Sequence, residues 1–130
     1  MDQPLPLVYA CAGCSLAGRV AYDVAQELTR RQAAQMSCLA GVAAELPIFV
    51  QLLREREAWV IDGCPLECAR AIFDRLGRPI ERHIRLREYG VPKNDSARFQ
   101  ADIPEIVDRI CHDTHNHCRV DLGDKQATIS

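Results

Sequence analysis

Residues 58–65, with the sequence AWVIDGCP, determine the fold that we predict for this chain. The first four are apolar and favour strands, which is typical of a central strand covered on both faces of a sheet. Asp-Gly-Cys-Pro ends the strand, and apolar residues at helical spacing then predict a helix that starts at Pro65 and stops at Gly77. The predicted core stripe of this helix consists of Leu66, Ala69, Ile72, Phe73 and Leu76.

A similar unit occurs near the N-terminus. Residues 5–10 (LPLVYA) are a short apolar run, and residues 11–14 (CAGC) form a turn that contains glycine. Ser15 can cap a helix that continues to about Arg31 with apolar residues at helical spacing. Two copies of a strand, a glycine–cysteine turn and a helix indicate parallel strands joined by right-handed crossovers.

Three weaker patterns complete the predicted fold. Residues 34–39 are a strand candidate, and one helix is expected from about Gly41 to Arg56. Residues 80–87 alternate apolar and charged side chains, which predicts an edge strand with one solvated face. Residues 103–111 have helical spacing and predict a last helix packed on the sheet. The fold class is thus α/β, with three layers, a small and mostly parallel sheet, and helices on both faces.

The length and charge of the chain restrict its function. The 130 residues suit one domain, which we assign to residues 1–118, followed by a polar tail at 119–130 that we expect to be flexible. A net charge of -2 gives no basic field for nucleic acid or an anionic membrane. No segment approaches the ~20 apolar residues of a membrane helix, and residues 1–6 do not resemble a secretory signal. We therefore expect a cytoplasmic protein without nucleic-acid or membrane partners.

Seven cysteines are the main functional signal. In a reducing compartment an odd number does not indicate a disulfide framework, so metal binding or thiol chemistry is the better interpretation. Turns that follow parallel strands meet at one edge of the sheet, and helix N-termini there favour thiolates. Cys68, four residues after Cys64, is expected on the first turn of the same helix and facing the same way. The cysteines that we expect at this edge are Cys11, Cys14, Cys38, Cys64 and Cys68.

Several kinds of chemistry fit such a cluster. Four thiolates match tetrahedral zinc, although copper(I) and iron–sulfur clusters also accept sulfur ligands. The metal could be structural, carried or sensed, or could serve only to fold an interaction module. The alternative is thiol-redox or persulfide chemistry, in which Cys64 or Cys11 attacks and a neighbouring cysteine resolves the intermediate as a disulfide. No catalytic constellation identifies an enzyme, and if the protein is one, we expect it to be thiol-based.

Four ordered motifs resemble the DGC-domain family, which is named after its central Asp-Gly-Cys sequence. They are residues 11–18 (CAGCSLAG), 36–41 (MSCLAG), 61–69 (IDGCPLECA) and 89–93 (YGVPK). The resemblance covers residues 7–93 and implies a small zinc-binding protein to which no reaction is firmly attached. It places the metal ligands at Cys11, Cys14, Cys64 and Cys68, with Cys38 as a fifth cysteine close by. Either Cys14 or Cys38 would complete a set of four.

The remaining polar residues have simpler interpretations. We expect Asp62 to accept loop N–H bonds, with orientation of a metal ligand as the alternative, and Lys93 either to face the cysteines or to be solvated. His83 is expected on the surface of the edge strand, and Cys111 in the core of the last helix. Arginines such as Arg54, Arg56, Arg82, Arg85 and Arg87 are interpreted as solvated. A tract of His112, His115, His117 and Cys118 could bind a second metal, although imidazoles also suit a helix C-terminus.

Overall fold

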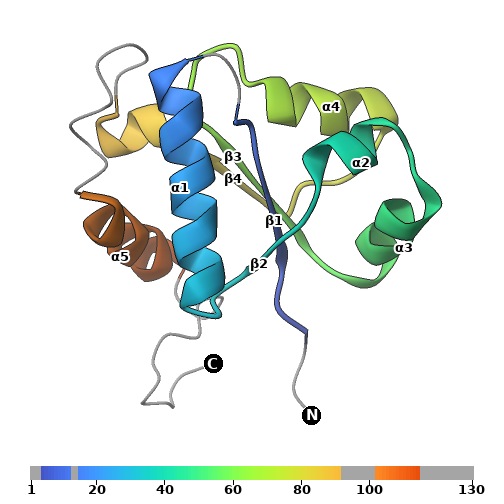
Figure 1. The fold of residues 1–130 in the computed structure, drawn as a ribbon, viewed down its shortest axis with the longest axis horizontal. Helices are drawn as coiled ribbons and strands as arrows, with labels where there is room; N and C mark the ends of the chain where they lie inside the picture. Colours follow the sequence, from blue (N-terminus) through green and yellow to red (C-terminus); the bar gives the residue numbers. More distant parts are fainter. Residues whose placement is uncertain (1–3, 13–14, 92–101, 115–130) are drawn as a thin grey trace.

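The computed structural model describes residues 4–12, 15–91 and 102–114. Within these residues, four parallel strands form one sheet in the order β2-β1-β3-β4 (Figure 1). The strands are β1 (Leu7–Ala10), β2 (Gln35–Met36), β3 (Ala58–Asp62) and β4 (Arg82–Arg85). This arrangement confirms the predicted parallel sheet and the edge position of the strand within residues 80–87. The predicted end of the domain at residue 118 and the tail at 119–130 lie outside the described residues.

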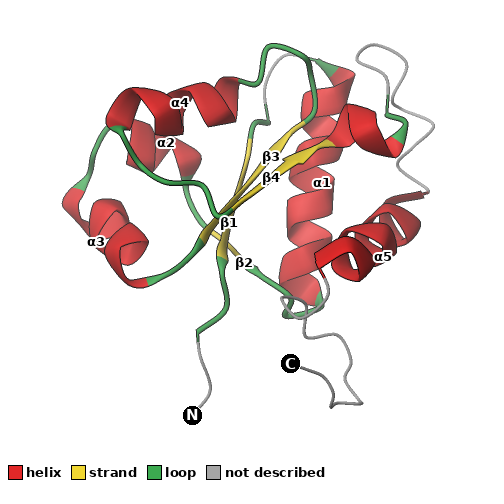
Figure 2. Ribbon diagram, turned by 180° about the vertical axis from the view of Figure 1, so that it is seen from behind, coloured by secondary structure: helices red, strands yellow, loops and turns green. Residues whose placement is uncertain are grey.

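Helices cover both faces of the sheet, as predicted (Figures 1 and 2). On one face, α1 (Leu16–Arg30) and α5 (Ile103–Thr114) lie side by side. On the other face lie α2 (Leu39–Ala43), α3 (Pro47–Glu55) and α4 (Cys68–Leu76), and a 3-10 helix η1 (Leu86–Tyr89) follows β4. None of the helices in the described part of the chain is long and apolar enough to cross a lipid bilayer.

β3 connects the two halves of the core. Its Trp59 and Ile61 pack on the side of α1 and α5, whereas Val60 packs on the side of α4. Because successive side chains of a strand alternate between the faces, a central strand needs apolar residues at almost every position. All five residues of β3 are buried, and this burial explains the continuous apolar run that precedes the Asp-Gly-Cys sequence.

Local signals explain where α1 begins and α4 ends. The side chain of Ser15 accepts a hydrogen bond from the backbone N–H of Gly18, which confirms the predicted N-cap of α1. Gly77 ends α4 with a φ of 67°, a left-handed conformation that glycine adopts without strain.

Two predicted helix boundaries are wrong. The single helix expected from Gly41 to Arg56 is two helices, because Glu45 has a left-handed backbone with a φ of 56° and Pro47 starts α3. The helix expected to start at Pro65 begins at Cys68, because Glu67 is also left-handed. Leu66, assigned to its core stripe, is 70% exposed.

The loop after β3 touches the start of α1 through its backbone. A Cβ atom on Gly63 would lie 2.0 Å from the carbonyl oxygen of Ala17 and 3.0 Å from the nitrogen of Gly18. Only glycine allows this close approach, because the atoms on both sides belong to the backbone and cannot rotate away. The glycine of the Asp-Gly-Cys sequence thus allows the loop before Cys64 to pack directly against the first turn of α1.

Ion pairs at the end of α1 connect it to α5. The side chain of Glu27 accepts hydrogen bonds from Arg30 and Arg31, and Arg31 also reaches Asp108 of α5 at 2.6 Å. The hydrogen bond from Arg30 is the largest influence that lowers the pKa of Glu27, burial opposes it, and Arg31 adds to it, which leaves the pKa at about 2. Glu27 therefore stays ionised in the folded protein at acidities that protonate an ordinary glutamate.

We predict that Glu27→Gln removes a pH-dependent part of the stability. The depressed pKa stabilises the fold above the ordinary value of 4.5, and this contribution is lost as the pH falls toward about 2. Since Arg30 is largely exposed, we expect a loss of only about 1–2 kcal/mol at pH 7. Urea unfolding of both proteins should show this difference at pH 7 and almost none at pH 2. A similar loss for exposed Glu57→Gln would contradict the assignment.

We further predict that Gly63→Ala destabilises the fold by about 3 kcal/mol, since backbone must move to admit the methyl group. Gly77→Ala is the matched control, because it has a left-handed backbone but no atom within 4 Å of the new Cβ. It should cost about 1 kcal/mol from backbone strain alone. Chemical denaturation measures both free energies of unfolding. Equal costs would show that the contact with Ala17 is not tight.

Candidate functional site

The carboxyl ends of β1 and β3 form the place where a ligand is expected in this topology. The chain leaves β1 for α1 on one face of the sheet and leaves β3 for α4 on the other (Figure 1). Between two such neighbouring strands the loops diverge, and α/β proteins bind ligands in the crevice that results. Cys11 directly follows β1, Cys64 follows β3 by two residues, and the N–H of Cys11 donates to the carbonyl of Ile61 at 3.4 Å.

The described cysteines differ in their surroundings. Cys11 is half-buried and packs against the core on the side of α4, whereas half-buried Cys64 packs against the core on the side of α1. Cys68 is exposed at the first position of α4, which confirms its predicted place on the first turn of this helix, but the helix begins too late to relate it to Cys64 by a helical turn. Exposed Cys38 precedes α2, and its Sγ accepts a hydrogen bond from the N–H of Gly41 at 3.2 Å.

The structure describes only part of the predicted four-cysteine site. Cys14 lies outside the described residues, as do Lys93, His115, His117 and Cys118. Among the residues that are described, no three histidine, cysteine, aspartate or glutamate side chains are grouped so that they could hold a metal ion. The metal site formed by Cys11, Cys14, Cys64 and Cys68, with Cys38 nearby, therefore stays a prediction.

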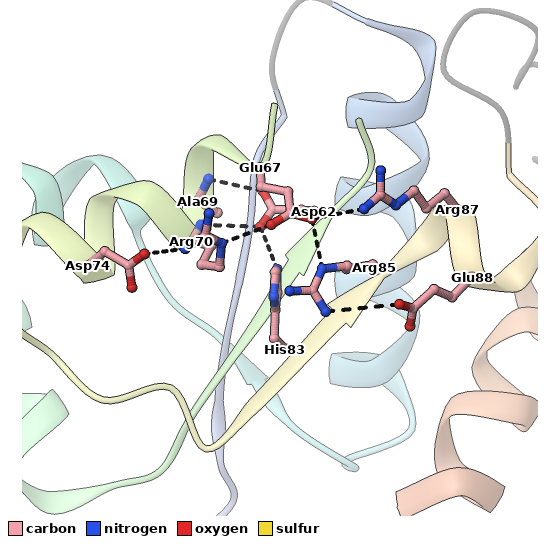
Figure 3. Close-up of polar contacts among 9 residues, drawn as sticks. All are labelled: Asp62, Glu67, Ala69, Arg70, Asp74, His83, Arg85, Arg87 and Glu88. Carbon is pink, nitrogen blue, oxygen red and sulfur yellow. Dashed lines mark hydrogen bonds and ion pairs between the residues drawn. The ribbon is translucent and has the colours of Figure 1, made fainter. Parts of the chain in front are cut away.

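Asp62 is a buried carboxylate with three hydrogen-bond donors (Figure 3). Its oxygens accept from the N–H of Ala69 at 3.0 Å, the N–H of Arg70 at 3.2 Å and Nε2 of His83 at 2.8 Å. The two backbone donors belong to the first turn of α4, where helical N–H groups have no partner within the helix. Asp62 accordingly braces the turn, as the sequence interpretation favoured.

His83 is a residue that the sequence interpretation misjudged. It was expected on the surface of the edge strand, but its side chain is only 12% exposed and it contacts Asp62. Since an ionised carboxylate only accepts hydrogen bonds, Nε2 of His83 donates to it. The spacing of two between His83 and Arg85 was the available signal, because it puts both side chains on one face of β4.

Glu67 is the second buried carboxylate of the site and was not singled out from the sequence. Its oxygens bind Nε of Arg70 at 2.8 Å and Nε of Arg85 at 2.7 Å, and Arg87 lies 3.7 Å away. Burial raises the pKa of Glu67, but the hydrogen bonds from Arg70 and Arg85 outweigh it, so the pKa is lower than usual. The interpretation of the arginines as merely solvated is therefore wrong for Arg85.

Two further predictions concern α5. Cys111 is buried on the face of α5 that packs into the core, which confirms the prediction of a small buried residue. His112 is exposed in the last turns of the helix. The other members of its histidine and cysteine tract lie beyond the described range, so a second metal site there stays a prediction.

Comparison with known proteins places the chain in a family. The family model described as "DGC domain" matches residues 7–110. The "Anaerobic and virulence modulator AnvM" of Pseudomonas aeruginosa is 43% identical over 93 residues, which are 71% of this chain and 71% of that protein. No solved structure matches the chain significantly. With a family match over most of its length and a relative of this similarity, the chain belongs to the DGC domain family.

Proposed function

We propose that this protein binds one zinc ion through cysteine thiolates at the carboxyl edge of its sheet. The observation that carries the proposal is the backbone contact between Gly63 and Ala17. Gly63 immediately precedes Cys64, and Ala17 lies in the first turn of the helix that follows Cys14 and Ser15. This contact holds the residue before Cys64 against the start of the helix that follows the loop of Cys11 and Cys14, and its geometry requires glycine at position 63.

The donor chemistry of these loops suits zinc. Thiolate sulfur is a preferred zinc ligand, and four thiolates complete a tetrahedral site. In this proposal Cys11 and Cys14 come from the loop after β1, and Cys64 and Cys68 from the segment after β3, so the ion cross-links two loops. The exposure of Cys68 favours an exchangeable ion, as in a carrier or a sensor, over a closed structural site.

We predict that protein purified anaerobically, without chelators or a histidine tag, contains about one zinc per chain by elemental analysis. Serine at any of the four ligand positions should lower that content, because the hydroxyl is a poor zinc ligand. Cys111→Ala is the matched control, since Cys111 is buried against α1 and should not affect zinc. Cys38→Ser tests whether the fifth cysteine takes part. Unchanged zinc in every variant would contradict the four-cysteine site.

A second function, reversible thiol chemistry, is favoured by the environment of Cys38. Its Sγ accepts a hydrogen bond from the N–H of Gly41 and is exposed, so an oxidant or an electrophile can reach the sulfur from solvent. The relative AnvM is named as an anaerobic modulator, and a thiol that responds to oxidants would suit a comparable role here. Under this second function the same cysteines exchange disulfides instead of binding a metal.

We predict for this second function that metal-free protein reacts with iodoacetamide fastest at Cys38. Peptide mass spectrometry after short exposures gives the rate at each cysteine. Cys38→Ser should remove the fast phase, while Cys111→Ala should leave it unchanged because buried Cys111 is shielded from the reagent. Slow and uniform alkylation of the metal-free protein would decide against thiol chemistry.

A further inference from the structure

The segment from Cys64 to Cys68 is closed by its own backbone. The N–H of Glu67 donates to the carbonyl of Cys64 at 3.1 Å, and the carbonyl of Glu67 accepts from Ala71 inside α4. Glu67 has a left-handed conformation with a φ of 53° and a ψ of 52°, which residues other than glycine rarely adopt. The backbone conformation of Glu67 therefore determines how Cys64 is placed relative to Cys68. Because this conformation is strained, other contacts must stabilise it.

The side chain of Glu67 supplies this restraint. Only 9% of it is exposed, and its two oxygens accept hydrogen bonds from Arg70 of α4 and Arg85 of β4. Arg70 in turn pairs with Asp74, and Arg85 lies 3.9 Å from Glu88, so both arginines are themselves held (Figure 3). A buried carboxylate between two such donors resists movement, since leaving them would strand its charge.

Asp62 restrains the other end of the same segment. It lies two residues before Cys64, and its partners are the first turn of α4 and His83 of β4. His83 and Arg85 are alternate residues of one strand, and each binds one carboxylate, His83 that of Asp62 before Cys64 and Arg85 that of Glu67 just before Cys68 (Figure 3). The edge strand thus contacts the cysteine segment at both of its ends.

We infer that β4 is a positioning element for the cysteine site: His83 acts through Asp62 and Arg85 acts through Glu67 to set the spacing of Cys64 and Cys68 for their ligand. This inference rests on the proposed zinc function. None of the four residues needs to touch the metal, and their effect is on the affinity of the thiolates for it. Arg85 is the most informative of them, because it connects the segment to a strand 18 residues away in sequence.

The test is the zinc affinity of purified Arg85→Gln, measured by competition with a chromophoric chelator at a temperature where circular dichroism shows every variant to be folded. Removal of a group that orients metal ligands typically weakens metal binding about 10- to 100-fold, and we expect a loss in this range. Arg54→Gln is the matched control, since Arg54 is an exposed arginine on α3. Arg85→Lys, which keeps the charge but not the planar guanidinium, should fall between the two.

A second variant distinguishes the effect of the Glu67 side chain from that of the Glu67 backbone conformation. Glu67→Gly tolerates the left-handed conformation but lacks the carboxylate, so it should lose affinity like Arg85→Gln. The double variant should lose little more than the worse single variant, because both remove the same interaction. The cobalt(II) absorption spectrum, which reports ligand geometry, should change in these variants and not in Arg54→Gln.

The outcomes distinguish the two proposals. Zinc affinities of Arg85→Gln and Glu67→Gly within twofold of Arg54→Gln, with unchanged cobalt spectra, would overturn the positioning role while leaving zinc binding intact. A wild-type chain that binds no zinc would overturn the proposed function instead. The positioning role is then decided by alkylation rates at Cys64 and Cys68, which Arg85→Gln must change and Arg54→Gln must not.

Discussion

The buried carboxylate of Asp62 holds the carboxyl edge of the sheet together. A carboxylate removed from water is stable only when donors bind its oxygens, and Asp62 has two backbone donors from α4 and the ring of His83. These donors belong to the helix that follows β3 and to the strand beside it. One side chain at the end of β3 therefore fixes the direction of α4 and the position of β4 next to the cysteine loop.

Much of the fold can be predicted from sequence because its signals are local. Ser15 before a periodic apolar segment located α1, the unbroken apolar run of β3 indicated a central strand, and the alternation within residues 80–87 indicated an edge. The helix predicted from Gly41 to Arg56 failed for a physical reason. The apolar pattern indicates which residues are buried, but it does not indicate that the backbone of Glu45 is left-handed. Pro47 also suits the first turn of a new helix as well as an early position in a longer one.

The candidate site could be predicted only where it depends on strand order along the chain. The turns after parallel strands meet at one edge, so Cys11, Cys38 and Cys64 could be placed near the strand ends. The partners of the carboxylates could not be predicted, since His83 lies 21 residues after Asp62 and reaches it only because β4 pairs with β3. A spacing of two put His83 and Arg85 on the same face of β4, but it gave no indication that α4 covers that face.

The segment between Cys64 and Cys68 is held by polar bonds because its apolar side chains lie outside the core. Pro65 is exposed and Leu66 is 70% exposed, so neither core half extends over it. Hydrophobic burial has no preferred direction, whereas hydrogen bonds and ion pairs to a carboxylate fix both distance and angle. Under the proposed zinc function, Cys64 and Cys68 would need that kind of control to bind one ion. The free energy that desolvation of Asp62 and Glu67 costs is offset by the donors around them, and in return the loop acquires a defined geometry that packing alone would not give it.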